Sequence, residues 1–375
     1  MNEFALLYPP DIRFGWGCRE SLAEMLSGLD VEPSKKTLFV CSESACASGL
    51  VEPLLHVCGS TASDVFTGVP HDPALEIVDA IVDQCRELDA KVVVAIGGGS
   101  VIDAAKAAAV LAPLEGTTAD YFHGRRAITG AGLPLIALPT TAGTGAEITK
   151  NSVLSDHATG VKKSLRSPHM VPCAALVDPQ LTVSMPSALT AASGLDALTQ
   201  AVESFLSLKA NSVSRALARQ AVPLLMEFLP RAFLDGSDQA ARTAVAEGSL
   251  LSAMAFSQSG LGAVHGLAHP IGLDLDLPHG LVCAVLLPHV LHWNASVCGP
   301  ALDTLALEVA LPDGAAFVAR VETLCGELGI SANFAGTALK GSIDHIVANC
   351  RSGSMAANPR PMSDEDVRNM LERLA

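Results

Sequence analysis

The chain has 375 residues, which is too long for one ordinary hydrophobic core and favours two domains. Apolar residues make up 49% of it and charged residues only 17%, so it has enough apolar side chains to fill a large interior. The formal net charge of -15 at pH 7 argues against nucleic acid or an anionic membrane as a partner, because phosphate groups would be repelled.

The N-terminal sequence and the cysteines favour a cytoplasmic protein. The first residues, MNEFALLYPPDIRFG, carry an early acid and lack the apolar core of a signal peptide. No uninterrupted apolar run approaches the roughly 18 residues that a membrane span needs. The 10 cysteines are scattered without a CxxC pair, which is typical of reduced thiols. We therefore expect a cytoplasmic protein that is not embedded in a membrane.

The first half of the chain alternates short apolar runs with helical patterns. Residues 74–90 have the 3.6-residue period of an amphipathic helix. This alternation predicts βαβ units around a parallel sheet. The strands predicted from apolar runs are 37–41, 92–96, 135–138 and 174–177.

After about Asp178 the pattern becomes helical almost throughout. We predict an α/β nucleotide-binding domain over residues 1–183 and an all-α domain over residues 184–375, with proline and serine marking the break. The last helix is expected to begin at Ser363 as its N-cap, with acidic residues in the first turn.

Two loops that follow strands have the composition of a phosphate-binding site. Gly97, Gly98, Gly99 and Ser100 separate a predicted strand from a helix, so the backbone can approach an anion at the helix N-terminus. This is not the GxGxxG fingerprint, and a tight turn remains the alternative. The second loop follows the 135–138 strand, and the alternative there is an ordinary Ser/Thr loop; its hydroxyl residues include Thr140, Thr141 and Thr144.

Residues that suit a metal site lie in the second half. His265 and His269 are four apart, so they share one face of a helix, and His279 follows at an element boundary. Asp196 and Gln200 have the same spacing in an apolar stretch, where a buried carboxylate needs a partner such as a metal ion or a lysine. The alternatives are packed histidines bonded to backbone carbonyls, and an N-cap role for Asp196.

With these segments in view, the chain resembles the iron-containing, or group III, alcohol dehydrogenase family over nearly its whole length. The resemblance implies a dehydroquinate synthase-like architecture, NAD(H) or NADP(H), and Fe(II) or alternatively Zn(II), with interconversion of primary alcohols and aldehydes by hydride transfer. It also suggests a homodimer or larger. The matching motifs are GGGSVIDAAK, PTTAGTGAE, DPQLTVSMP, GLDALTQAVES, HGLAHPIG and LPHG.

By this resemblance the metal ligands are Asp196, Gln200, His265 and His279. The family normally has histidine where this chain has Gln200, and a neutral amide oxygen is a weaker donor than imidazole. The remaining aspartate and two histidines match a facial triad, so metal binding at reduced affinity and an empty site are both open. His269, one turn from His265, is expected to take part in proton transfer, with a packing role as the alternative.

The resemblance also assigns the cofactor-binding residues. NAD-specific relatives often have an aspartate where this chain has Ser42, so NADP(H) is permitted and weakly favoured; the alternative is that Glu43, next to it, substitutes for that carboxylate. The assigned positions are Ser42, Gly97, Gly98, Gly99, Ser100, Asp103, Thr140, Thr141, Thr144 and Lys162.

Three other functions stay open on the sequence. One is a metal-independent reductase like those that act on maleylacetate, although their histidine motif differs from HGLAHPIG. A second is a zinc- and NAD-dependent glycerol dehydrogenase or dehydroquinate synthase, which the HGLAHPIG and LPHG motifs disfavour. The third is a non-catalytic nucleotide-binding protein. The sequence does not indicate which alcohol or aldehyde is the substrate.

Overall fold

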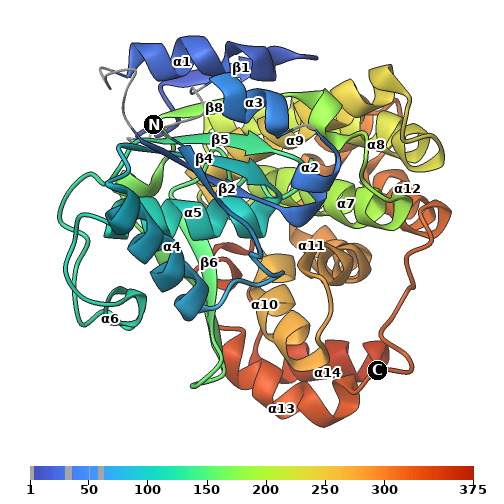
Figure 1. The fold of residues 1–375 in the computed structure, drawn as a ribbon. Coiled ribbons are helices and arrows are strands. Elements are labelled where there is room, and N and C mark those ends of the chain that lie inside the picture. The colour runs from blue at the N-terminus through green and yellow to red at the C-terminus, as the bar shows by residue number, and fades with distance from the viewer. Residues whose placement is uncertain (1–3, 30–35, 50, 58–62) are drawn as a thin grey trace. The chain divides into compact units, whose positions relative to one another are not determined.

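The structure, a computed structural model, describes residues 4–29, 36–49, 51–57 and 63–375 (Figure 1). It separates into two compact units. The sheet unit comprises Leu7–Thr141 and Gly145–Ser184, and the helical unit comprises Met185–Ala375 with Ala142–Thr144 and residues 4–6. The division along the main chain therefore falls between Ser184 and Met185, and Thr144 groups with the helical unit.

The sheet unit is built on six strands, and each pair of neighbours is parallel. Their order across the sheet is β1-β8-β5-β4-β2-β3. The predicted parallel α/β fold is confirmed, and the four strands expected from apolar runs are all present. The bounds are β1 Asp11–Phe14, β2 Thr37–Cys41, β3 Ser63–Phe66, β4 Val92–Gly97, β5 Leu135–Pro139 and β8 Ala174–Val177.

Both faces of this sheet are covered by helices, which explains why its central strands are apolar at every position. In β4, Val93 and Ala95 belong to the core beneath α4 (Leu75–Leu88) and α5 (Gly99–Leu111). Val94 and Ile96 belong to the core on the other face, with residues of α1 (Leu22–Gly28) and α3 (Glu52–Val57) (Figure 1). The short helices of this unit are α2 Glu43–Ala47 and α6 Thr118–Phe122.

The sequence did not predict four of the strands. β1 and β3 are four-residue strands at the two edges of the sheet, and their residues mix polar and apolar types. β6 (Asn151–Asp156) and β7 (Val161–Arg166) form a separate antiparallel hairpin with many polar side chains. Short, half-covered strands lack the continuous apolar run that identified the central ones.

The helical unit contains the predicted run of helices. α7 packs against α8, α9 and α11, and α10 packs against α11 and α13. Ser363 caps α14 in a capping box with Asp366, as expected. The bounds are α7 Ser187–Leu206, α8 Ser212–Leu234, α9 Gln239–Ser259, α10 Ala263–Leu275, α11 His279–Glu308, α12 Gly314–Glu327, α13 Leu339–Asn349 and α14 Asp364–Leu374.

The helix α11 bears on the expectation that no segment crosses a membrane. It has 30 residues and, by length and composition, is apolar enough to cross a membrane, although no such segment was expected. However, 61% of its most apolar window is buried inside the protein, where it packs on α7, α10 and α12. A buried core helix passes the same test, so this helix is weak support for a membrane span.

We expect Gly132→Ala to destabilise the sheet unit. A Cβ at this position would lie 2.3 Å from the carbonyl oxygen of Ala109 and from Cα of Val110, so the backbone of α5 would have to move. The cost of such overpacking is about 1–3 kcal/mol. Gly130→Ala is the matched control, because nothing lies within 4 Å of a Cβ there. Thermal unfolding should show a lower transition temperature for Gly132→Ala alone, and equal transitions would contradict this packing.

Candidate functional site

The helix α7 places three polar side chains on one buried face. Asp196, Gln200 and Glu203 follow one another at spacings of four and three residues, which puts them on the same side of a helix. All three are buried. Asp196 lies well inside α7, which begins at Ser187, so the alternative that it is an N-cap is wrong.

The imidazole of His265 on α10 lies between two of these carboxylates. Its Nδ1 is 2.7 Å from Oε2 of Glu203, and its Nε2 is 3.3 Å from Oδ1 of Asp196. The other oxygen of Glu203, Oε1, accepts a hydrogen bond of 2.7 Å from the backbone N–H of Val264. Glu203 therefore fixes the plane of the His265 ring and directs Nε2 toward Asp196.

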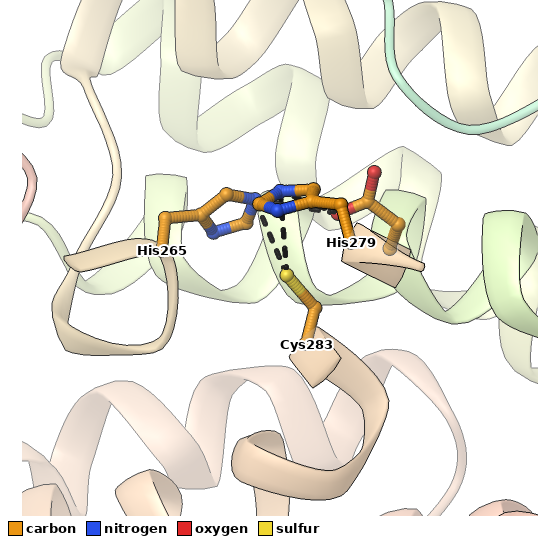
Figure 2. Close-up of side chains that lie close together, drawn as sticks. His265, His279 and Cys283 are labelled. Carbon is orange, nitrogen blue, oxygen red and sulfur yellow. Dashed lines mark hydrogen bonds and ion pairs between the residues drawn. The ribbon is translucent and has the colours of Figure 1, made fainter. Parts of the chain in front are cut away.

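Two further donor atoms come from the start of α11 (Figure 2). His279 is the first residue of the helix, and its Nε2 lies 4.0 Å from Oδ1 of Asp196. Cys283 follows one turn later, and its sulfur lies 3.5 Å from Nε2 of His279 and 3.9 Å from Nε2 of His265. Asp196, His265, His279 and Cys283 each offer one ligand atom, and these four atoms all lie within 4.8 Å of one another.

The charges in this cluster depend on burial and on the neighbouring groups. Burial by itself would raise the pKa of Asp196, but the neighbouring imidazole of His265 and the charge of His279 outweigh it and lower that pKa. Burial would lower the pKa of His265, yet the acidic groups around it raise it well above its usual value. Burial raises the pKa of the Cys283 thiol to about 12, so this group is not an anion at neutral pH.

The amide of Gln200 is turned toward the outer oxygen of Asp196. Its Nε2 donates a hydrogen bond of 3.1 Å to Oδ2 of that carboxylate. The amide oxygen, Oε1, is buried and accepts no hydrogen bond from the residues that the structure describes. Within the described chain, Oδ1 of Asp196 likewise accepts no hydrogen bond, and it faces the two imidazoles instead.

The third histidine of this region lies beside the cluster. The ring of His269 stacks on that of His279, with 4.9 Å between the ring centroids and 19° between the planes. The structure thus brings together the predicted site residues of α7, α10 and α11, which are Asp196, Gln200, His265, His269 and His279.

The donor set fits a divalent metal ion. A carboxylate, two imidazoles and a thiol converge in a buried space, and Oδ1 of Asp196, buried without a hydrogen bond, needs a cation or a donor. The helices can approach because glycines lie at their contacts. A Cβ at Gly280 would be 2.5 Å from the carbonyl oxygen of Ala192, and one at Gly262 would be 2.7 Å from Oε1 of Glu203.

In the sheet unit, the glycine-rich turn lies at the carboxyl ends of β2, β4 and β5. Gly97 ends β4, and Gly98 is the N-cap of α5, without a side chain to cover the first N–H groups of that helix. The backbone N–H of Ser42 donates to the carbonyl of Ile96, and that of Thr140 donates to the carbonyl of Gly97. The residues predicted on the three strand ends are therefore neighbours at this edge of the sheet.

The space over the turn is narrow, which accounts for its glycines. A Cβ at Gly97 would lie 2.6 Å from Cβ of Val101, and one at Gly98 would lie 3.3 Å from Cγ2 of Thr141. Gly99 opens α5 and Ser100 follows it, and Oγ of Ser100 accepts a long hydrogen bond of 3.4 Å from the N–H of Asp72. The open helix N-terminus favours an anion at this position.

Other predicted cofactor residues have structural partners. Oδ1 of Asp103 is 2.8 Å from Nζ of Lys106, and Oδ2 accepts a hydrogen bond from Val153 at the start of the hairpin. Nζ of Lys162 is 2.6 Å from Oδ2 of Asp72, an ion pair that helps to lower the pKa of Asp72 although burial opposes it. The Asp103 contacts support packing of the sheet unit more directly than ligand binding.

Sequence reasoning missed two members of the cluster, Glu203 and Cys283. The spacing from Asp196 to Glu203, two turns of the same helix, could have identified the first. The spacing of four residues from His279 to Cys283 could have identified the second. Neither residue stands out in the sequence by itself, because an isolated acid or an isolated cysteine in an apolar helix is commonly explained by packing.

A nucleotide-type strand-turn-helix and a buried carboxylate–histidine cluster together define the class of nucleotide-dependent, metal-binding enzymes. The family profile described as "Iron-containing alcohol dehydrogenase" matches residues 9–179. The profile described as "Fe-containing alcohol dehydrogenase family, C-terminal" matches residues 190–375. The chain belongs to the iron-containing alcohol dehydrogenase family and is an oxidoreductase of the alcohol dehydrogenase type, as the sequence predicted.

Individual relatives match over nearly the whole chain. Long-chain-alcohol dehydrogenase 1 of Geobacillus thermodenitrificans (strain NG80-2) is 33% identical over 99% of this chain and 97% of its own. 4-Hydroxybutyrate dehydrogenase of Cupriavidus necator is 34% identical over 90% of this chain and 92% of its own. Among solved structures, sulfoacetaldehyde reductase from Bifidobacterium kashiwanohense in complex with NAD+ has a TM-score of 0.93 and 28% identity, and it covers 100% of this chain and 99% of its own.

We expect Glu203→Ala to destabilise the metal-free protein strongly. It leaves Nδ1 of His265 and the N–H of Val264 without their acceptor in a buried place, and removing one partner of a buried ion pair costs about 3–5 kcal/mol. Glu322→Ala is the matched control, because Glu322 pairs with His292 at the same 2.7 Å on the surface. An exposed pair contributes at most about 1 kcal/mol. Denaturant unfolding in the presence of a chelator measures both, and equal losses would contradict the role assigned to Glu203.

Proposed function

We propose that this chain catalyses the NAD(P)(H)-dependent interconversion of a primary alcohol and an aldehyde at a divalent metal centre in its helical unit. The observation that carries the proposal is the convergence of Asp196, His265 and His279, with Glu203 behind His265. Such carboxylate–histidine–metal arrangements fix the tautomer of the ligand and raise its basicity. Membership of the iron-containing family supports Fe(II) as the ion, with Zn(II) as the alternative.

The residues that would hold the metal are Asp196, His265 and His279. A divalent ion bound there would supply Lewis acidity to the oxygen of the substrate, favouring the alkoxide in oxidation and polarising the carbonyl in reduction. Of these three side chains only His279 is appreciably exposed, at 23%, against 2% for Asp196 and 4% for His265. The substrate therefore approaches from the His279 side.

The protein's own groups handle the protons. Burial would lower the pKa of His265, but the acidic groups around it raise that pKa well above its usual value, so a metal ion at Nε2 would compete with a proton. Glu203 keeps the proton on Nδ1. We assign His269, stacked on His279, to the transfer of the proton that the alcohol oxygen gains or loses.

The glycine-rich turn of the sheet unit is proposed to bind the cofactor, which supplies or accepts the hydride. Gly97, Gly98, Gly99 and Ser100 would hold the pyrophosphate at the N-terminus of α5. Thr140, Thr141 and Thr144 would line the site, and Asp103 and Lys162 would support it through their partners. A relative crystallised with NAD+ supports NAD(H) in general.

We also propose a cofactor preference, a substrate class and an assembly. A serine rather than an acid at position 42 favours acceptance of NADP(H) as well as NAD(H), because no carboxylate there repels a 2′-phosphate. The substrates of the relatives, from long-chain alcohols to 4-hydroxybutyrate, differ widely, so we propose a primary alcohol or aldehyde without naming one. We further propose a cytoplasmic homodimer or larger assembly that binds neither nucleic acid nor membrane.

Removal of the metal is expected to abolish turnover. Reduction of a panel of aldehydes by NADH or NADPH is followed anaerobically with Fe(II) or Zn(II) and, in parallel, with a chelator. Since Lewis-acid stabilisation is worth several kcal/mol, the rate should fall by about 100-fold or more in chelator and return when the ion is restored. Equal rates in chelator would contradict the metal centre and favour the metal-independent reductase.

Ser42→Asp is expected to turn cofactor preference toward NAD(H). Aspartate can replace serine as the N-cap of α2, so the fold is kept, while the new carboxylate binds the ribose hydroxyls and repels a 2′-phosphate. We expect kcat/KM with NADPH to fall by about 10-fold or more relative to that with NADH. Ser48→Asp adds the same charge at the other end of α2 and serves as control. An unchanged ratio in Ser42→Asp would remove Ser42 from the cofactor site.

A further inference from the structure

The donor set of the buried cluster differs from the one that the family resemblance implies. The resemblance assigns the fourth ligand to position 200, where this chain has glutamine. Cys283, a position that the resemblance does not assign, directs its sulfur at the two imidazoles (Figure 2). The thiol comes from α11 and the amide from α7.

The distances among the donor atoms match those of a four-ligand metal site. Metal–nitrogen and metal–oxygen bonds of about 2.0–2.1 Å and a metal–sulfur bond of about 2.3 Å give tetrahedron edges of about 3.3–3.6 Å. The sulfur of Cys283 is 3.5 Å from Nε2 of His279 and 3.9 Å from Nε2 of His265. Oδ1 of Asp196 is 3.3 Å and 4.0 Å from the same two nitrogen atoms. All four atoms lie within 4.8 Å of one another, so the set would contract around one ion.

Gln200 has a different use in the same geometry. Its amide N–H group donates to Oδ2 of Asp196, and this contact leaves Oδ1 directed at His265 and His279. Gln200 therefore orients a ligand from outside the cluster, as a hydrogen-bonded neighbour of a metal-binding carboxylate commonly does. Its own oxygen is a much weaker donor for Fe(II) or Zn(II) than a thiolate.

We propose that Cys283 is the fourth protein ligand of the metal centre, and that Gln200 positions Asp196 instead of binding the ion. The inference rests on the metal centre of the proposed function and adds a sulfur ligand to it; the oxygen of the substrate would then be a fifth ligand. On binding, the S–H bond of Cys283 breaks, a sulfur–metal bond forms with the same electron pair, and the proton passes to the solvent. No change of oxidation state occurs.

The test is a titration of the metal-free protein with Co(II), which substitutes for Zn(II) and reports sulfur ligation by an intense charge-transfer band in the near ultraviolet. The wild-type chain should show this band, rising to one equivalent of Co(II). Cys283→Ser should lose the band and bind Co(II) about 10-fold or more weakly, since oxygen replaces thiolate. Cys283→Ala, which removes the side-chain donor altogether, should lose the band as well, and circular dichroism shows whether each variant is folded.

Two controls make the outcome specific. Cys298→Ser changes another buried cysteine of α11 and should keep both the band and the affinity. Gln200→Ala should keep the band, because the sulfur ligand is retained. A band that persists in Cys283→Ser, or one that is lost in Gln200→Ala with unchanged binding by Cys283→Ser, would overturn the proposal.

The wild-type titration separates this inference from the proposed function. Stoichiometric binding of Co(II) without the sulfur band would contradict the role of Cys283 and leave the metal centre in place. A wild-type chain that binds neither Co(II) nor Zn(II) would contradict the metal centre itself, and the inference about Cys283 would fail with it.

Discussion

The buried carboxylate of Asp196 is the charge on which the arrangement of the helical unit depends. An uncompensated carboxylate at this depth in α7 would cost several kcal/mol, so partners have to be brought to it. Gln200 supplies one hydrogen bond from the same helix, and His265 and His279 approach from α10 and α11. The close contact of Gly280 with the backbone of Ala192 lets α11 come near enough. The same contacts therefore pack these helices together and compensate the charge of Asp196.

The helix α7 also orients the His265 ring, through Glu203. Glu203 lies two turns from Asp196, and the His265 ring is held between the two carboxylates. The ring is thus oriented before any ion arrives, which reduces the reorganisation that binding requires. The arrangement has a cost in the metal-free chain, because it favours a proton on the nitrogen that should bind the metal. Proton and metal ion compete for the same atom, which ties the affinity of the site to its protonation.

Sequence periodicity was sufficient for the centre of the fold and insufficient for its edges. The strand Val92–Gly97 is buried on both faces, so its apolar run identified it directly, and the helix Leu75–Leu88 followed from its period. The edge strands Asp11–Phe14 and Ser63–Phe66 are covered only in part and carry charges, which gives no comparable pattern. The spacing of His265 and His269 correctly placed both on one helix, but spacing could not say which of their neighbours on α7 and α11 would face them.

Position 200 illustrates what a motif comparison leaves out. Taken along the sequence, a glutamine in place of a histidine suggests a site that has lost a ligand and part of its affinity. In space, the amide of Gln200 bonds the outer oxygen of Asp196, while the sulfur of Cys283 faces the two imidazoles from another helix. A ligand set is defined by atoms that meet at a point, and residues from any element that reaches that point can supply them. The four donor atoms here converge although only three of their residues match the family pattern. Whether a substitution empties a site therefore depends on which side chains lie across from it, and a single motif position does not carry that information.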